Sequence, residues 1–208
     1  MNLPFSKKQK SKTIERPLLL RGYAAAEVWF YGVVKTEFAV QTFNINETEP
    51  TTVKELCAAA EKYASKNEVF TRRREFFVST YAFEDWNYKD ICDYAAKAER
   101  FSKQEYERSE ILKYAEIGYI PTTPQRDRLG AFLKEHSAKD GAVILNRIEK
   151  ELRLGHRNSD ALEKMLEFAA VPAEKLNECK MLIIEMARFC PNWSIGGTFN
   201  RVDEEEEM

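Results

Sequence analysis

The order of apolar and polar residues changes along the chain, and its first clear signal is an alternation with a period of two. Within residues 33–45, β-branched and aromatic side chains occupy every second position, at Val34, Thr36, Phe38 and Val40. Such alternation is typical of a half-buried strand, so we predict a strand over 33–45. Residues 18–32 mix alanines, which favour a helix, with residues that favour strands. We prefer a strand or hairpin there, with a helix as the alternative.

Helical spacing begins after residue 50. Thr52 stands three residues before Glu55, which is the pattern of a capping box, and apolar residues then recur at intervals of three and four. We therefore predict an amphipathic helix over 52–66. Residues 74–83 are rich in aromatic and β-branched side chains and predict a strand, with a helix again as the alternative.

From residue 85 to residue 190 the apolar pattern is helical throughout, and prolines at 121 and 124 mark a hinge. Helix-capping residues then divide the remainder into four helices with short connections. The expected fold class is α+β and predominantly helical, with a small N-terminal β-sheet packed with helices and a C-terminal four-helix unit. The expected organisation is a basic flexible arm at 1–16, an α+β domain at 17–120, a helical bundle at 121–191, and a loop with an acidic disordered tail at 192–208.

Composition supports a folded, soluble chain, because 44% of the residues are hydrophobic and 32% are charged. No run approaches the roughly 18 apolar residues of a transmembrane helix, and no signal peptide is recognised, so no membrane partner is expected. The four cysteines are dispersed, without a C-x-x-C motif. Free thiols in a reducing compartment predict a cytoplasmic location.

Catalytic motifs are absent from the sequence. It contains no P-loop, no G-x-G-x-x-G fingerprint and no H-E-x-x-H helix, and its two histidines, His136 and His156, stand apart. Asp90 and Asp93 share a helical face and could form a carboxylate site for a divalent metal, which is the one alternative to a protein without catalytic activity. Acidic residues at the start of a helix also stabilise its dipole, so the pair has an ordinary structural explanation. We predict no cofactor and no enzymatic activity.

The most unusual segment is "FTRRREFF" at residues 70–77, in which Arg72, Arg73 and Arg74 lie between Phe70 and Phe76. Guanidinium groups bind phosphate and aromatic rings stack on bases, so this combination suits a nucleic acid. An acidic protein partner would be satisfied by the same charges. A basic sheet edge that discourages pairing with other sheets is the structural alternative. Four further lysines of the N-terminal arm belong to the predicted basic surface, namely Lys7, Lys8, Lys10 and Lys12.

These features predict an adaptor or regulatory binding protein, associated with a nucleic-acid-handling complex through its basic surface. The formal net charge of −2 argues against a protein that simply coats nucleic acid. One alternative is a protein–protein interaction module or inhibitor without nucleic-acid contact, and a carboxylate- and metal-dependent enzyme is the other. We expect a protein partner. A second copy of the chain is one candidate, because an apolar stripe over 176–190 is suited to helix pairing.

Overall fold

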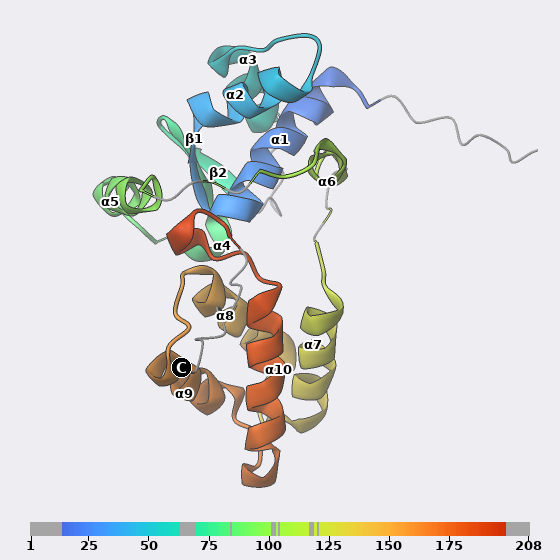
Figure 1. Ribbon diagram of the computed structural model, residues 1–208, viewed down its shortest axis with the longest axis vertical. Helices are drawn as coiled ribbons and strands as arrows, with labels where there is room; N and C mark the ends of the chain where they lie inside the picture. Colours follow the sequence, from blue (N-terminus) through green and yellow to red (C-terminus); the bar gives the residue numbers. More distant parts are fainter. Residues whose placement is uncertain are drawn as a thin grey trace, which may run out of the picture.

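The computed structural model describes residues 14–62, 70–83, 85–100, 103, 105–116, 119 and 121–198. A mixed N-terminal part lies above a four-helix unit in Figure 1. The N-terminal part consists of α1 (Arg16–Tyr31), β1 (Val33–Lys35), α2 (Thr36–Asn46), α3 (Val53–Lys62), β2 (Phe70–Arg73), β3 (Phe76–Ser79), α4 (Thr80–Phe83), α5 (Tyr88–Ala98) and α6 (Arg108–Lys113). The predicted arm lysines and the acidic residues 203–207 lie outside the described residues.

The C-terminal unit consists of α7 (Pro124–His136), α8 (Gly141–Arg153), α9 (Ser159–Ala169), the short 3-10 turn η1 (Ala173–Lys175) and α10 (Leu176–Arg188). A last 3-10 turn, η2 (Trp193–Ile195), follows it. This arrangement confirms the predicted α+β, predominantly helical fold class. None of the described helices is both long enough and apolar enough to cross a membrane. Cys57, Cys179 and Cys190 are buried free thiols, whereas the free thiol Cys92 is only partly buried.

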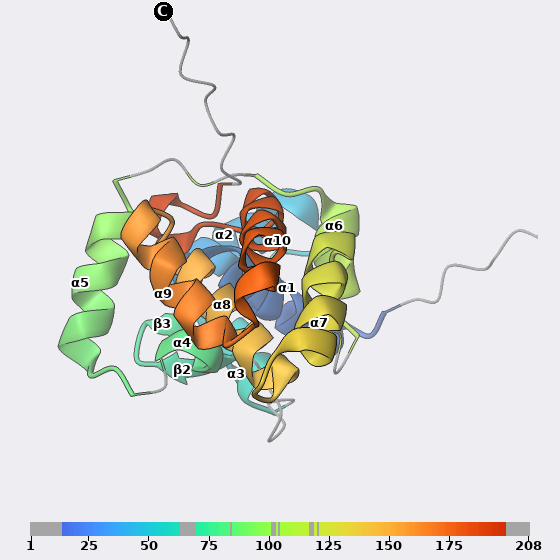
Figure 2. The same ribbon diagram turned by 90° about the horizontal axis from the view of Figure 1, so that it is seen from below.

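The three strands form an antiparallel sheet in the order β1-β3-β2. The sheet separates two apolar clusters, because neighbouring residues on a strand point to opposite faces. Phe70 and Phe77 belong to the cluster around α1, α2 and α3, whereas Phe76 and Val78 belong to the cluster around α5 and η2. In both views of the molecule α5 and α6 lie on opposite sides (Figures 1 and 2).

The strand or hairpin preferred for 18–32 is wrong, because the structure forms helix α1 there. This helix packs against α2, α3, α6 and the sheet, and most of its residues are buried. A helix buried on nearly all sides has no polar face, so its sequence shows no helical stripe. At Gly22 a Cβ would lie 2.8 Å from the backbone nitrogen of Ala115, and at Gly32 the backbone turns with a φ of +74° and ends the helix.

The strand predicted over 33–45 is also largely wrong, since β1 covers only three residues and α2 follows at once. The buried residues of α2 are Thr36, Ala39 and Phe43, and their spacing is that of a helix. The sequence of this segment fits both an alternating pattern and a helical pattern. Tertiary packing favours the helix. The strand predicted at 74–83 is shorter than expected, because β3 begins only at Phe76 and ends at Ser79, and helix α4 begins at Thr80.

The helix starts at Thr52, Thr123 and Asp140 are confirmed by side-chain caps, whereas the helix expected to open near Ser102 begins only at Arg108, as α6. Thr52 Oγ1 accepts a hydrogen bond from the Glu55 amide at 3.3 Å at the start of α3. Thr123 accepts one from the Arg126 amide at 3.1 Å, and Asp140 caps α8 in the same manner. These contacts are local in sequence, which explains why they could be recognised without the fold.

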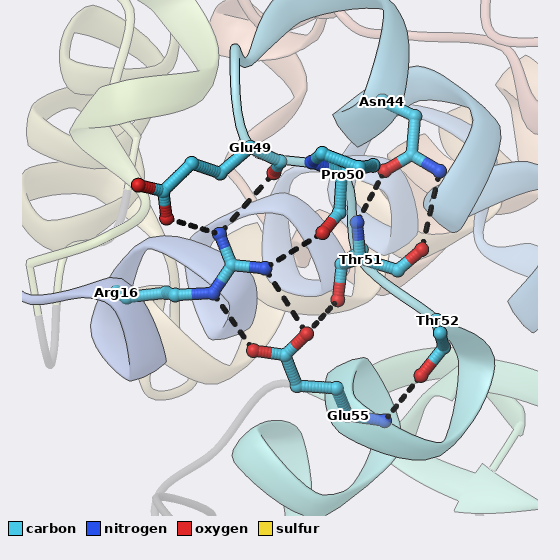
Figure 3. Close-up of polar contacts among 7 residues, drawn as sticks. All are labelled: Arg16, Asn44, Glu49, Pro50, Thr51, Thr52 and Glu55. Carbon is cyan, nitrogen blue, oxygen red and sulfur yellow. Dashed lines mark hydrogen bonds and ion pairs between the residues drawn. The ribbon is translucent and has the colours of Figure 1, made fainter.

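Arg16 was predicted to end the flexible arm, but the structure anchors it at the start of α1 (Figure 3). Its Nε lies 2.7 Å from Glu55 Oε1, and its Nη2 donates to the Pro50 carbonyl oxygen at 2.9 Å. Thr51 Oγ1 donates to the second oxygen of Glu55 at 2.7 Å. These bonds join the first turn of α1 to α3 and to the loop before α3, so the charge of Arg16 is matched within the chain.

The segment after α10 returns to the N-terminal part. Trp193 is 1% exposed and packs with Phe83 and Ile91 in the cluster beside α5. Its Nε1 donates to the carbonyl oxygen of Trp29 at 2.9 Å. Residues 192–198 therefore contribute to the N-terminal core through Trp193, although the sequence predicted only a loop there.

Candidate functional site

The predicted arginines lie at the tip of the β2–β3 hairpin. The register pairs Arg73 with Phe76 and leaves Arg74 and Glu75 as a two-residue turn. Arg72 and Arg73 are neighbours on one strand, so their side chains point to opposite faces of the ribbon. A common phosphate-binding surface requires the three guanidinium groups to lie on one face. In this hairpin they do not.

Arg72 and Arg74 make internal contacts that fix the directions of their side chains. Arg72 Nε lies 2.5 Å from Glu61 Oε1, and Arg72 Nη1 donates to the Arg74 carbonyl oxygen at 3.2 Å. The Arg74 guanidinium lies over the ring of Tyr88, 4.1 Å from its centroid. The structure thus directs Arg72 toward α3 and Arg74 toward α5.

Phe70 and Phe76, the predicted stacking residues, are only 4% and 3% exposed. Phe70 packs edge-on against Phe77 in one cluster, and Phe76 lies in the other. A base can stack only on a ring that is exposed to solvent. Because both rings are buried, Phe70 and Phe76 cannot serve as the predicted stacking residues. Their burial follows from strand pairing, which the sequence alone does not specify.

The other sequence candidates do not form a catalytic or metal site among the residues that the structure describes. Asp90 and Asp93 lie on α5 beside Trp86 and Lys97. The backbone amide of Asp90 takes part in the Asn87 cap, as expected of a first-turn residue. No group of three or more potential metal ligands occurs among the residues that the structure describes. His136 packs against Phe132, and the Nδ1 of His156 lies 2.6 Å from a Glu151 carboxylate oxygen.

A pocket that the sequence did not reveal lies between α1, α2 and α6. Its volume is about 400 Å³. We call it the Glu27 pocket. Polar, charged and aromatic groups contribute to its wall, and the lining residues are Glu27, Phe30, Tyr31, Phe38, Gln41, Thr42, Ile45, Asn46, Lys103, Glu105, Tyr106 and Ile111.

Glu27 is the buried acid of this pocket. It is 4% exposed, and its Oε2 has no hydrogen-bond partner among the described residues. Burial raises the pKa of Glu27 to about 7, although a hydrogen bond with Thr42 and the positive charge of Lys103 oppose the shift. A carboxyl group in this state changes its charge near neutral pH and lacks a partner for one oxygen.

Lys103 supplies the opposing charge. Its Nζ lies over the ring of Phe38, 3.5 Å from the centroid, and 5.0 Å from the centroid of Tyr31. Burial lowers the pKa of Lys103, and the negative charges of Glu27 and Glu99 act in the opposite direction. The Glu27 pocket therefore already holds an ammonium group against aromatic faces.

The aromatic wall is fixed by its own contacts. Phe30 and Tyr106 stack with centroids 3.4 Å apart and an interplanar angle of 6°. The Tyr106 hydroxyl donates to the Gly197 carbonyl oxygen at 2.9 Å, so the returning C-terminal segment holds this ring in place. Tyr31 meets Phe38 edge-on at 5.8 Å. Rings held in this way form a largely preorganised surface for a ligand.

Sequence analysis did not identify Glu27 or Lys103 as site residues. One signal for Glu27 exists, because it is the only charged residue between Gly22 and Gly32. A lone acid in an apolar run is costly to bury and therefore suggests a role. Lys103 has no such signal, since its neighbours in sequence are polar and its rings come from α1 and α2.

Comparisons with known proteins give no relative for this chain. No protein-family model, no curated protein and no solved structure matches it.

Proposed function

We propose that this chain is a non-enzymatic binding protein and that its Glu27 pocket takes the alkylammonium group of a ligand. A carboxylate within a wall of aromatic rings is the combination that recognises organic cations. The carboxylate provides charge and a hydrogen-bond acceptor, and the ring faces attract the same cation through their quadrupoles.

The observation that carries the proposal is the partnerless Oε2 of Glu27. A buried carboxylate oxygen without a donor is destabilising, by about 1–3 kcal/mol or more when charged. An ammonium group has three donors and can supply the missing bond. A bound ligand of this type would remove an unfavourable feature of the free protein, which is a source of affinity.

The position of Lys103 supports the ligand class. Its Nζ lies 3.5 Å from the Phe38 centroid, so the pocket accommodates a primary ammonium group next to this ring. A ligand amine would compete with Lys103 for the same aromatic face. Lys103 therefore competes with the ligand amine for the Phe38 ring, and replacement of Lys103 tests the site.

Titration with n-butylammonium, followed by NMR at pH 8, tests the proposal. At this pH Glu27 is ionised, because its pKa is raised only to about 7. We expect saturable shifts of the pocket residues with n-butylammonium and none with 1-butanol, a neutral molecule of similar size. Glu27→Gln should weaken the binding at least tenfold.

Glu37→Gln is the matched control, because Glu37 is an exposed carboxylate on α2 that does not line the pocket. It should bind n-butylammonium as the unaltered chain does. Equal binding of butanol and butylammonium, or equal binding by Glu27→Gln and the unaltered chain, would overturn the proposal. Circular dichroism of each variant verifies that the fold is retained.

A second candidate function, binding of nucleic acid or an acidic protein by the hairpin, is favoured by one observation. Arg74 has a φ of +56°, a left-handed conformation that residues other than glycine and asparagine rarely adopt. Such strain often accompanies a functional requirement. Fluorescence anisotropy with a labelled oligonucleotide and with a polyglutamate peptide, at low and moderate salt, tests it. Exchange of Arg73 and Arg74 for Glu should abolish binding, whereas Lys139→Glu should not.

A further inference from the structure

A cluster of buried charges lies where the four-helix unit meets the N-terminal part. It consists of Arg126 on α7 with Glu149 and Arg153 on α8, and we call it the junction cluster. Arg153 donates through Nε and Nη2 to Glu149 Oε1, at 3.2 and 2.9 Å. Arg126 Nε donates to Glu149 Oε2 at 2.8 Å. One carboxylate therefore serves two guanidinium groups.

The junction cluster carries an excess positive charge. The side chains of Arg126, Glu149 and Arg153 are 21%, 5% and 3% exposed. Both arginines stay protonated. Burial alone would raise the pKa of Glu149, but the positive charges of Arg153 and Arg126 outweigh it and keep that pKa below the usual value. Two cations thus face one anion in a poorly solvated region, which favours the approach of another anion.

Nearby charged groups do not neutralise the excess positive charge of the junction cluster. Arg157 is also mostly buried and donates to the carbonyl oxygens of Leu152, Ala187 and Cys190, which close α8 and α10. Glu110 lies toward the other side of the cluster, but Lys113 pairs with it at 2.6 Å. The local balance is consequently positive.

The junction cluster borders a pocket of about 260 Å³, the junction pocket. Its walls include Trp29, Tyr81 and Trp193, and Ser79 and Asn146 contribute polar groups. Arg126 reaches this pocket with Nη2 bonded to Asn146 Oδ1 at 3.2 Å, while its Nη1 has no hydrogen-bond partner among the described residues. An unused guanidinium donor, aromatic walls and an excess positive charge thus meet in one place.

From this arrangement we infer that the junction pocket binds a small aromatic carboxylate. The ligand's carboxylate accepts hydrogen bonds from Arg126 and balances the charge of the junction cluster, and its ring packs against the tryptophan and tyrosine side chains. This site is separate from the Glu27 pocket and does not depend on the proposed function. Because the lining residues come from both parts of the fold, the ligand would join α7 and α8 to α1 and β3.

Tryptophan fluorescence tests the inference directly, since Trp29 and Trp193 line the junction pocket. The probe is benzoate, with benzyl alcohol as a neutral molecule of similar shape and inorganic phosphate as an anion without a ring. We expect saturable quenching by benzoate at concentrations at least tenfold lower than for either control. Equal effects of benzoate and benzyl alcohol would overturn the role of charge, and equal effects of benzoate and phosphate would overturn the role of the ring.

Two variants assign the site. Arg126→Gln should raise the dissociation constant for benzoate at least tenfold, and Arg126→Lys, which keeps the charge, should retain the preference for benzoate over benzyl alcohol. Arg128→Gln is the matched control, because Arg128 is an exposed arginine of the same helix that pairs with Glu185. Unchanged benzoate binding by a folded Arg126→Gln protein would contradict the inference, as would a complete absence of quenching in the unaltered chain.

Discussion

The guanidinium group of Arg153 lies over the indole ring of Trp29, 3.8 Å from its centroid, and donates to the carbonyl oxygen of the same residue at 3.0 Å. That carbonyl belongs to the last turn of α1, where the helix itself supplies no donor. Trp193 Nε1 donates to the same oxygen at 2.9 Å. Two segments of the C-terminal half therefore complete the end of the first helix, and the two parts of the fold are joined at this carbonyl.

Replacement of Arg153 by Met should be strongly destabilising. It removes one cation from Glu149, which is 4% exposed, and one donor from the Trp29 carbonyl. Breaking a buried ion pair costs about 3–5 kcal/mol, whereas an exposed pair contributes about 0–1 kcal/mol. Urea unfolding should show this difference between Arg153→Met and the control Arg128→Met. Equal losses in the free energy of unfolding in the two variants would show that the buried ion pair stabilises the fold no more than the exposed one.

Trp193 variants should separate its hydrogen bond from its packing. Trp193→Phe keeps a ring but loses the donor to Trp29, so we expect a loss of about 1 kcal/mol, together with a smaller packing cost. Trp193→Ala should cost about 3–5 kcal/mol, because it leaves a cavity beside Phe83 and Gly32. Thermal unfolding followed by circular dichroism measures both values. A loss below 1 kcal/mol for Trp193→Ala would mean that the segment is not part of the core.

The pH dependence of stability should reveal Glu27. Burial raises its pKa from 4.5 to about 7, so the folded state holds this proton more tightly than the unfolded state. The contribution is complete below pH 4.5 and is lost as pH rises through about 7. The stability of Glu27→Gln relative to the unaltered chain should therefore increase across this range, by roughly 3 kcal/mol at most. Urea unfolding at several pH values measures the change, and a constant difference would contradict the assignment.

The affinity for the ligand should depend on the same ionisation of Glu27. It should rise with pH, whereas the contribution of Glu27 to stability falls. The alkylammonium ligand binds the charged carboxylate, so its affinity should rise from pH 5.5 and level off above the Glu27 pKa of about 7. Repetition of the n-butylammonium titration across this range provides the measurement. A flat profile would mean that the ligand does not interact with the Glu27 carboxylate.

Lys103→Met should increase the affinity for n-butylammonium severalfold. The substitution removes the ammonium that lies against Phe38 and keeps a side chain of similar length. The aromatic face then becomes available to the ligand. Lys97→Met, an exposed lysine of α5 outside the Glu27 pocket, should leave the affinity unchanged. A decrease in Lys103→Met would show that Lys103 assists the ligand instead of competing with it.

The helical unit could be predicted well from sequence because its boundaries depend on local contacts. The caps at Thr123 and Asn158 involve amides three residues away, so their residue types identify the helix starts directly. The first helix could not be predicted in this way. Its residues are buried on nearly all sides, and a uniformly apolar helix resembles a buried strand in sequence.

The candidate sites depend on contacts between distant residues, which no short segment of sequence specifies. Phe70 and Phe76 stand beside arginines in sequence, but pairing of β2 with β3 directs both rings into the core. Lys103 reaches a ring of α2 only because α1 and α2 fold against the chain that precedes α6. Charge runs are easy to recognise in a sequence, whereas buried charges of isolated residues become visible only in the structure.

The pKa of Glu27, measured by carbon NMR of its carboxyl group without and with n-butylammonium, tests the central claim most directly. In the free protein we expect a value of about 7, and saturation with the ligand should lower it because the bound cation stabilises the carboxylate. A carboxyl that titrates near 4.5 in the free protein, or one whose pKa does not change with the ligand, would contradict the account.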